Sequence, residues 1–460
     1  MSDLVIRGGT VVTTSSVGLA DVAVADGRIS AVGLNLDDAK QEIDASGLHI
    51  FAGGIDSHVH FNEPGHTDWE TIATGSAALA AGGCTAFVDM PLNSLPVTID
   101  GPAFDRKLAA AQASSRLDFG LWGGLVPGNL DRLEELHGRG ALGFKAFMCP
   151  SGLDEFPASD EQTLREGMKR IAELDSILLV HAEDPAAITN PKGPTARDFI
   201  ESRPWEAELS AVHDAIRWAR EAGCRLHIVH VSSIESAALI REQREQGVDV
   251  SGETCPHYLL YAEDDLEKLG GIGKCAPPFR TTRNVEEMWN ALAGGWLEMV
   301  VSDHSPSTQE LKQGNDFNKI WGGISGCQST RQLLLAKNRL ELPLIAALTS
   351  ANIAKRLGLQ HKGEVAPGLD ADLWLVDLEH EDVVRREDLL YRNQFSAHEG
   401  QPIRGRTVMT LGRGRTVFAD GRIISGPRSR LLRLADRPVD QRSRGTESRT
   451  FPESPRETST

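Results

Sequence analysis

A chain of 460 residues with a formal net charge of −17 has room for one large and one smaller domain, and it lacks the concentrated lysine and arginine of a nucleic-acid binder. No apolar run reaches the length of about 18 residues that would cross a membrane, and the N-terminus has no signal-peptide core. The six cysteines lack the short paired spacing of a zinc ribbon or a disulfide framework. We therefore expect a cytoplasmic protein with reduced thiols and with neither nucleic-acid nor membrane partners.

Both ends of the chain are typical of short β-strands. Apolar and polar residues alternate at 4–12 and 20–32, apolar strands are predicted at 370–378 and 407–411, and 415–424 forms a further hairpin. Asp26-Gly27 and Asp420-Gly421 are favoured hairpin dipeptides, and each begins the tetrapeptide Asp-Gly-Arg-Ile. We expect the two ends, 1–52 and 366–436, to pair into one small β-sandwich domain; two unrelated hairpins are the alternative.

Between these ends, short apolar runs alternate with helical patterns. Eight runs are expected to be strands: 54–60, 85–90, 118–124, 143–148, 177–181, 225–231, 248–254 and 298–303. Amphipathic spacing predicts helices at 67–81, 160–174, 205–222 and 233–246. This alternation predicts an α/β fold with a (β/α)8 TIM-like barrel over 53–365. A doubly wound open sheet is the competing fold, but no glycine-rich phosphate loop follows the first strand.

The last residues, 437–460, contain hardly any apolar side chains. Such a segment buries too little surface to offset its ordering entropy. We expect it to be a disordered tail.

Histidine, lysine and aspartate side chains stand at the ends of the predicted barrel strands. His58 and His60 end the first strand, and residues two apart on a strand point to the same side. A His-x-His pair alone is weak evidence, but TIM-barrel active sites lie at the C-terminal ends of the strands. Four more such residues end other strands: Lys145, His181, His230 and Asp303. Six converging groups exceed the four ligands of a structural zinc, so we expect two divalent metal ions.

The donor types narrow the choice of metal. Imidazole and carboxylate groups suit zinc, which we expect, and also cobalt, iron, nickel or manganese. Because an ammonium group is no ligand, we hypothesise that Lys145 loses its proton and reacts with carbon dioxide to form N6-carboxylysine, whose two oxygens bridge the metals. The remaining nearby histidines are assigned to packing or to contacts behind the ligands: His227, His257 and His304.

These residues lie in segments that resemble the cyclic amidohydrolases, the family of dihydroorotases, hydantoinases and allantoinases. The resemblance rests on His-Val-His-Phe-Asn-Glu-Pro-Gly (58–65), Gly-Phe-Lys (143–145), Val-His-Ala-Glu (180–183), Ile-Val-His-Val-Ser (228–232), Glu-Thr-Cys-Pro-His-Tyr (253–258) and Val-Ser-Asp-His-Ser-Pro (301–306). It extends to about residue 430 and implies the same six metal ligands, a small uncharged cyclic ureide as substrate, and a homo-oligomer, commonly a tetramer.

Within that family, four segments resemble the allantoinase branch: 89–93, 121–126, 274–278 and 321–324. Dihydroorotases typically carry an arginine two positions after the His-x-His pair, where this chain has Asn62, and hydantoinases usually place a tyrosine where it has Phe-Met-Cys-Pro-Ser at 147–151. The resemblance implies hydrolytic opening of allantoin to allantoate in purine catabolism. A hydantoinase or dihydropyrimidinase is the runner-up, and a dihydroorotase, a mononuclear deaminase or a non-catalytic scaffold are weaker alternatives.

The expected reaction assigns roles to further residues. Asp303 would carry a proton from the attacking water to the leaving ring nitrogen. Asn62, Cys149, Ser305 and the backbone around Gly323 are the candidate substrate contacts. The alternative for each polar side chain is a hydrogen bond to the neighbouring backbone.

Overall fold

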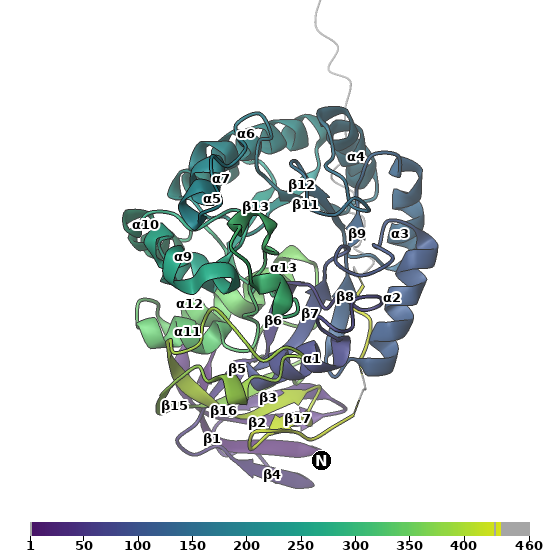
Figure 1. Cartoon of the computed structure of the whole chain (residues 1–460). Helices are drawn as coiled ribbons and strands as arrows, with labels where there is room; N and C mark the ends of the chain where they lie inside the picture. Colours follow the sequence, from purple (N-terminus) through teal and green to yellow (C-terminus); the bar gives the residue numbers. More distant parts are fainter. Residues whose placement is uncertain (1, 427–428, 434–460) are drawn as a thin grey trace, which may run out of the picture.

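The computed structural model describes residues 2–426 and 429–433, so the tail expected at 437–460 lies outside the described residues. A ring of strands and helices forms the larger part of the molecule, and a strand-rich domain made from both ends of the chain lies against it (Figure 1). None of the described helices is both long and apolar enough to cross a membrane.

The strand-rich domain is built on one nine-stranded sheet in the order β18-β17-β16-β15-β5-β1-β2-β3, with β4 paired to β1. Its strands are β1 (Leu4–Val12), β2 (Val17–Ala25), β3 (Arg28–Gly33), β4 (Gln41–Asp44), β5 (His49–Ala52), β15 (Leu373–Val383), β16 (Pro402–Gly412), β17 (Arg415–Ala419) and β18 (Arg422–Ile423). β5 and β15 run antiparallel, with Phe51 opposite Trp374. The predicted pairing of the two chain ends is therefore confirmed.

Both predicted hairpin turns have the expected backbone. Asp26 and Gly27 have φ angles of 51° and 76°, and Asp420 and Gly421 have 50° and 77°. Positive φ at both central residues is what a two-residue type I′ turn requires. Aspartate and glycine at these positions therefore set where β2 turns into β3 and β17 into β18.

The barrel strands are parallel and coincide with all eight predicted runs. They are β6 (Gly54–Val59), β7 (Cys84–Asp89), β8 (Asp118–Leu121), β9 (Gly123–Gly124), β10 (Phe144–Phe147), β11 (Ile177–His181), β12 (Arg225–Ile228), β13 (Val250–Thr254) and β14 (Met299–Val300). β8 and β9 belong to one run that is interrupted at Trp122. The ring closes beyond β14, where the N–H of His60 donates to the carbonyl oxygen of His304 over 2.8 Å. The closed barrel is confirmed in place of the open sheet.

Helices surround the ring (Figure 1). They are α1 (Ile72–Ala81), α2 (Gly101–Ser114), α3 (Leu133–Arg139), α4 (Glu161–Glu173), α5 (Ala196–Ser202), α6 (Trp205–Ala222), α7 (Ile234–Glu245), α8 (Pro256–Leu260), α9 (Glu263–Leu269), α10 (Thr282–Ala293), α11 (Thr330–Lys337), α12 (Leu342–Ala346) and α13 (Asn352–Arg356). The predicted helices are present, but the start at residue 67 is wrong. Residues 67–69 form a turn, and the Thr71 side chain caps the helix by accepting from the N–H of Thr74.

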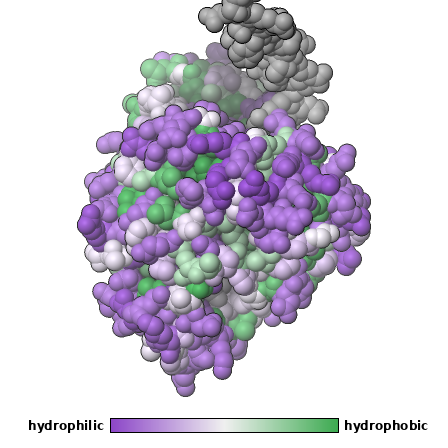
Figure 2. All heavy atoms as spheres, turned by 90° about the horizontal axis from the view of Figure 1, so that it is seen from above, coloured by the Kyte–Doolittle hydropathy of each residue, from purple (hydrophilic) through white to green (hydrophobic). Residues whose placement is uncertain are grey.

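A buried charge cluster joins the barrel to the β domain. The Lys362 ammonium lies 3.0 Å from Asp118 at the start of β8, and 3.3 and 2.5 Å from Asp370 and Asp372 just before β15. Burial would lower the pKa of Lys362, but the three carboxylates outweigh it and raise that pKa. The outer surface differs from this interior: seen from above, it is mostly hydrophilic, with hydrophobic side chains in scattered groups (Figure 2).

Candidate metal centre and substrate pocket

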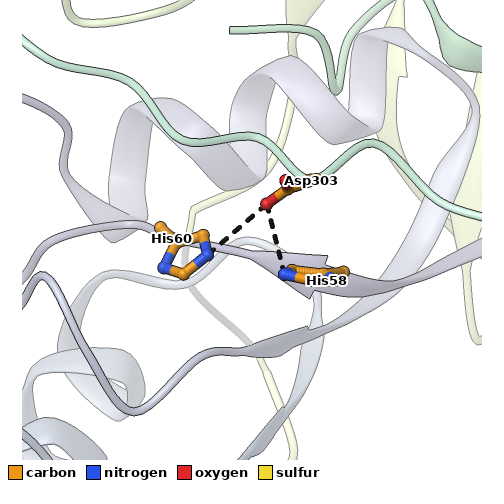
Figure 3. A group of neighbouring side chains, drawn as sticks. All are labelled: His58, His60 and Asp303. Carbon is orange, nitrogen blue, oxygen red and sulfur yellow. Dashed lines mark ion pairs between the residues drawn. The ribbon is translucent and has the colours of Figure 1, made fainter. Parts of the chain in front are cut away.

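His58, His60 and Asp303 converge at the C-terminal mouth of the barrel. Nε2 of His58 lies 3.2 Å and Nε2 of His60 lies 3.5 Å from the same carboxylate oxygen of Asp303 (Figure 3). The two histidines come from the end of β6, and Asp303 follows β14. Asp303 has a φ of 46°, a left-handed backbone that costs a non-glycine residue energy and is concentrated at functional sites.

The other three predicted ligands lie beside this group. The His230 ring is 5.5 Å from the His58 ring and 4.6 Å from the His181 ring, centroid to centroid. All six predicted ligands, Lys145 included, line one cavity of about 570 Å³. The structure thus brings together every residue that the strand-end pattern selected.

Lys145 and His230 have buried polar atoms without a partner among the described residues. Nζ of Lys145 and Nδ1 of His230 are buried and accept or donate no hydrogen bond there. Burial lowers the pKa of Lys145 to about 7, although Asp303 and Glu253 act in the opposite direction. Unpaired buried polar atoms are costly, so the amine of Lys145 and the imidazole of His230, left this way beside the Asp303 carboxylate, fit the binding of metal ions.

Two carboxylates that the sequence analysis did not select orient the histidines from behind. Nδ1 of His58 lies 2.5 Å from Glu253, and Nε2 of His181 lies 2.7 Å from Glu183. When each of these nitrogens donates its proton to the carboxylate, the other ring nitrogen keeps a free lone pair for a metal ion. The spacing His-Ala-Glu at 181–183 is a signal that could have identified Glu183.

Both carboxylates carry charge. Burial alone would raise the pKa of Glu253, but His58 and His227 outweigh it and lower that pKa to about 2. Burial opposes ionisation of Glu183 too, yet Arg203, whose guanidinium lies 2.5 Å from Glu183, and His181 lower its pKa below the usual value. Anionic partners of this kind make the attached imidazoles better metal ligands.

The four candidate substrate contacts divide into two pairs. Ser305 and Gly323 line the cavity, and the Ser305 hydroxyl donates to Asp303 over 3.1 Å. Asn62 and Cys149 are buried and lie outside the residues that line it. The Asn62 amide donates to the carbonyl oxygen of Pro306 over 3.2 Å, which matches the alternative of a polar side chain bonded to nearby backbone.

Other polar groups do reach the cavity. Its walls include Asn93, Ser151, Arg203 and Lys274. The amide nitrogen of Asn93 lies 3.2 Å from Nδ1 of His60. The strand-end pattern could not identify these residues, because Asn93 and Ser151 lie in loops that follow strands, Arg203 follows α5 and Lys274 follows the 3-10 turn Gly270–Gly273.

Comparison with known proteins agrees with this geometry. A model of the amidohydrolase family matches residues 49–417. An allantoinase of Rubrobacter xylanophilus is 51% identical over 94% of this chain and 97% of its own length, and one of Solibacter usitatus is 48% identical over the same shares. Among solved structures, the L-hydantoinase (dihydropyrimidinase) of Arthrobacter aurescens has a TM-score of 0.91 and 30% identity, covering 94% of this chain and 99% of that one.

Proposed function

The chain belongs to the amidohydrolase family, and on that premise we propose that it hydrolyses the ring of allantoin to allantoate at a binuclear metal centre. It is a cyclic amide hydrolase. The observation that carries the proposal is the meeting of four imidazoles, one carboxylate and one buried amine around a single cavity at the barrel mouth.

We assign the ligands by their proximity. His58, His60 and Asp303 would hold one ion, since their donor atoms lie within 4.8 Å of one another. His181 and His230 would hold the second ion. Lys145, as N6-carboxylysine, would bridge the two. Its buried Nζ has no hydrogen-bond partner among the described residues, and with a pKa of about 7 it is in part the neutral amine that reacts with carbon dioxide.

Divalent metal ions bound here would supply Lewis-acid chemistry, because they lower the pKa of water toward ~7 and polarise an amide carbonyl. Asp303 is ionised and so has a free carboxylate oxygen: burial would raise its pKa, but His58, His60 and His230 outweigh burial and keep that pKa well below the usual value. Asp303 takes the proton from the attacking water and delivers it to the ring nitrogen as the C–N bond breaks. The Ser305 hydroxyl holds the Asp303 carboxylate in place.

The choice of allantoin rests on two features. Relatives that are 48–51% identical over nearly their whole length are allantoinases, whereas the hydantoinase structure shares only 30% identity. Asn62 stands where dihydroorotases carry a carboxylate-binding arginine, and allantoin has no carboxylate. A dihydroorotate bound here would lack a charge-assisted hydrogen bond worth about 1.5–3 kcal/mol.

Hydantoin hydrolysis is the second candidate function, favoured by the TM-score of 0.91 with the L-hydantoinase. A substrate panel separates the two: allantoin, hydantoin, dihydrouracil and dihydroorotate are given to metal-reconstituted protein whose metal content is measured on the same sample. We expect allantoin to have the highest kcat/KM by far. A higher kcat/KM for hydantoin or dihydrouracil would overturn the substrate assignment.

We further propose that both metals are zinc, that the enzyme is a homotetramer and that it acts in the cytoplasm. The imidazole-rich donor set supports zinc, and the family resemblance supports the tetramer. Light scattering on the purified protein tests the oligomer, and metal analysis of protein purified without added metal tests the zinc.

A further inference from the structure

One wall of the substrate cavity is a loop segment without regular secondary structure beyond a single turn. This rim segment, residues 317–323, begins with a 3-10 turn (Phe317–Lys319) and contributes Ile320, Trp321 and Gly323 to the cavity wall. It contains most of the Trp-Gly-Gly-Ile segment at 321–324. Loop segments that line a binding site are normally mobile, so this segment needs specific contacts to keep a single conformation.

Lys274 holds the first half of the rim segment. Its ammonium group donates to the carbonyl oxygens of Phe317 over 2.7 Å and Ile320 over 2.6 Å, and it lies 3.3 Å from that of Asn318. The same ammonium group lies 4.8 Å from the centroid of the Phe199 ring. The side chain of Lys274 is thereby engaged on several sides.

Lys312 holds the second half. Its buried amino group, whose pKa burial lowers to about 7, donates to the carbonyl oxygens of Trp321, over 3.0 Å, and of Gly323. Together the two lysines engage five of the seven carbonyl groups of the rim segment, those of Phe317, Asn318, Ile320, Trp321 and Gly323. Among the described residues, the hydrogen-bond partners of both amino groups are backbone oxygens and not carboxylates, so these buried donors are satisfied only while the segment keeps this conformation.

The rim segment is also fixed in position relative to Asp303, the proposed proton carrier. The N–H of Gly323 donates to the carbonyl oxygen of Lys274 over 2.7 Å. Gly323 has a φ of 140°, and any Cβ there would collide with the carbonyl oxygen of Ser305. Since Ser305 donates to Asp303, the backbone at 321–323 has a fixed position relative to the catalytic carboxylate.

We propose that Lys274 and Lys312 are positioning residues that hold the rim segment in the shape that recognises the ring amide of a cyclic ureide. Five carbonyls are drawn into the protein, and the N–H groups of Trp321 and Gly323 donate to the carbonyl oxygens of Leu311 and Lys274. Of residues 321–323, Gly322 thus keeps an N–H and a C=O that have no partner among the described residues, and it lies at the cavity wall in a fixed position. A preorganised backbone binds a small polar ring without the entropy cost of ordering a loop. The identity of the ligand rests on the proposed function, whereas the clamp itself does not.

Lys274→Met and Lys312→Met test the clamp, because methionine nearly preserves length while removing the donor. We expect KM for the best cyclic amide substrate to rise by about tenfold or more, with kcat falling by less than about threefold and metal content unchanged. Amide hydrogen exchange over 317–323 should quicken while exchange in the barrel strands stays the same. Lys268→Met is the matched control, since Lys268 is 78% exposed on α9 and lies outside the cavity.

Unchanged KM and unchanged exchange over 317–323 in both methionine variants would overturn the proposal. If a variant folds poorly, the wild-type protein decides: amides of Ile320, Trp321 and Gly323 must exchange slowly, as in a folded element, and exchange at the rate of an open loop refutes the clamp. This readout needs no substrate, so a failure of the allantoin assignment in the substrate panel is distinguishable from a failure of the clamp.

Discussion

Glu253→Gln isolates the contribution of the carboxylate behind His58. In the wild type one oxygen of Glu253 lies 2.5 Å from Nδ1 of His58 and the other lies 3.0 Å from Nε2 of His227. A glutamine has nearly the same shape but no charge, and it offers only one acceptor oxygen to two imidazoles. The His58 bond would weaken from about 1.5–3 kcal/mol to about 0.5–1.5 kcal/mol, and loss of such an oriented partner lowers metal affinity by about 10–100-fold.

The assay for this prediction is competition between the protein and a chelator of known zinc affinity, followed by metal analysis. Zinc affinity should fall by about 10–100-fold in Glu253→Gln, with activity restored at high zinc. Glu245→Gln provides the control, because the Glu245 side chain is 61% exposed on α7. Native zinc affinity in Glu253→Gln would refute the reasoning that Glu253 orients His58 as a ligand.

Three further predictions concern Lys362, Lys145 and Asp303. Lys362→Met should lower the free energy of unfolding by about 3–5 kcal/mol in chemical denaturation, because the buried Asp372 loses the cation with which it pairs, whereas Asp118 and Asp370 keep Arg430; a loss below about 1 kcal/mol would contradict this. Because burial lowers the pKa of Lys145 to about 7, its neutral fraction rises from about a tenth to about nine-tenths between pH 6 and 8. Metal-free protein given zinc and labelled bicarbonate should therefore gain the carbamate signal in 13C NMR more readily at the higher pH, and a pH-independent yield would argue against carboxylation. Asp303→Asn should lower kcat by about 100-fold or more in samples of equal metal content, and near-native turnover would remove Asp303 from the proton path.

The sequence was sufficient to locate the six candidate ligands because barrel geometry relates chain position to space. Every strand of a parallel barrel ends at the same mouth, so His58 and Asp303, 245 positions apart, are neighbours whatever the loops between them do. The paired turns at Asp26 and Asp420 were predictable for a similar reason, since a type I′ turn depends on its own two residues.

Contacts made by loop residues, and by the carboxylates that hydrogen-bond to the ligand histidines, were not predictable in this way. The side chain of Glu253 on β13 meets that of His58 on β6 inside the barrel, and no local spacing in the sequence connects them. The alternative raised for each polar candidate matches the placement of Asn62, whose amide is bonded to the carbonyl oxygen of Pro306. Lys274 reaches the rim segment between the rings of Phe199 and Phe317, and Lys312 reaches it from the 3-10 turn Glu310–Lys312. A sequence pattern does not encode the directions of these side chains.

Anomalous X-ray scattering at the zinc edge, on crystals of zinc-reconstituted protein, tests the central claim most directly. We expect two strong peaks at the barrel mouth, one contacted by His58, His60 and Asp303 and the other by His181 and His230, with carboxylated Lys145 between them. A single peak, or peaks away from these side chains, would contradict a binuclear centre built from the six strand-end residues.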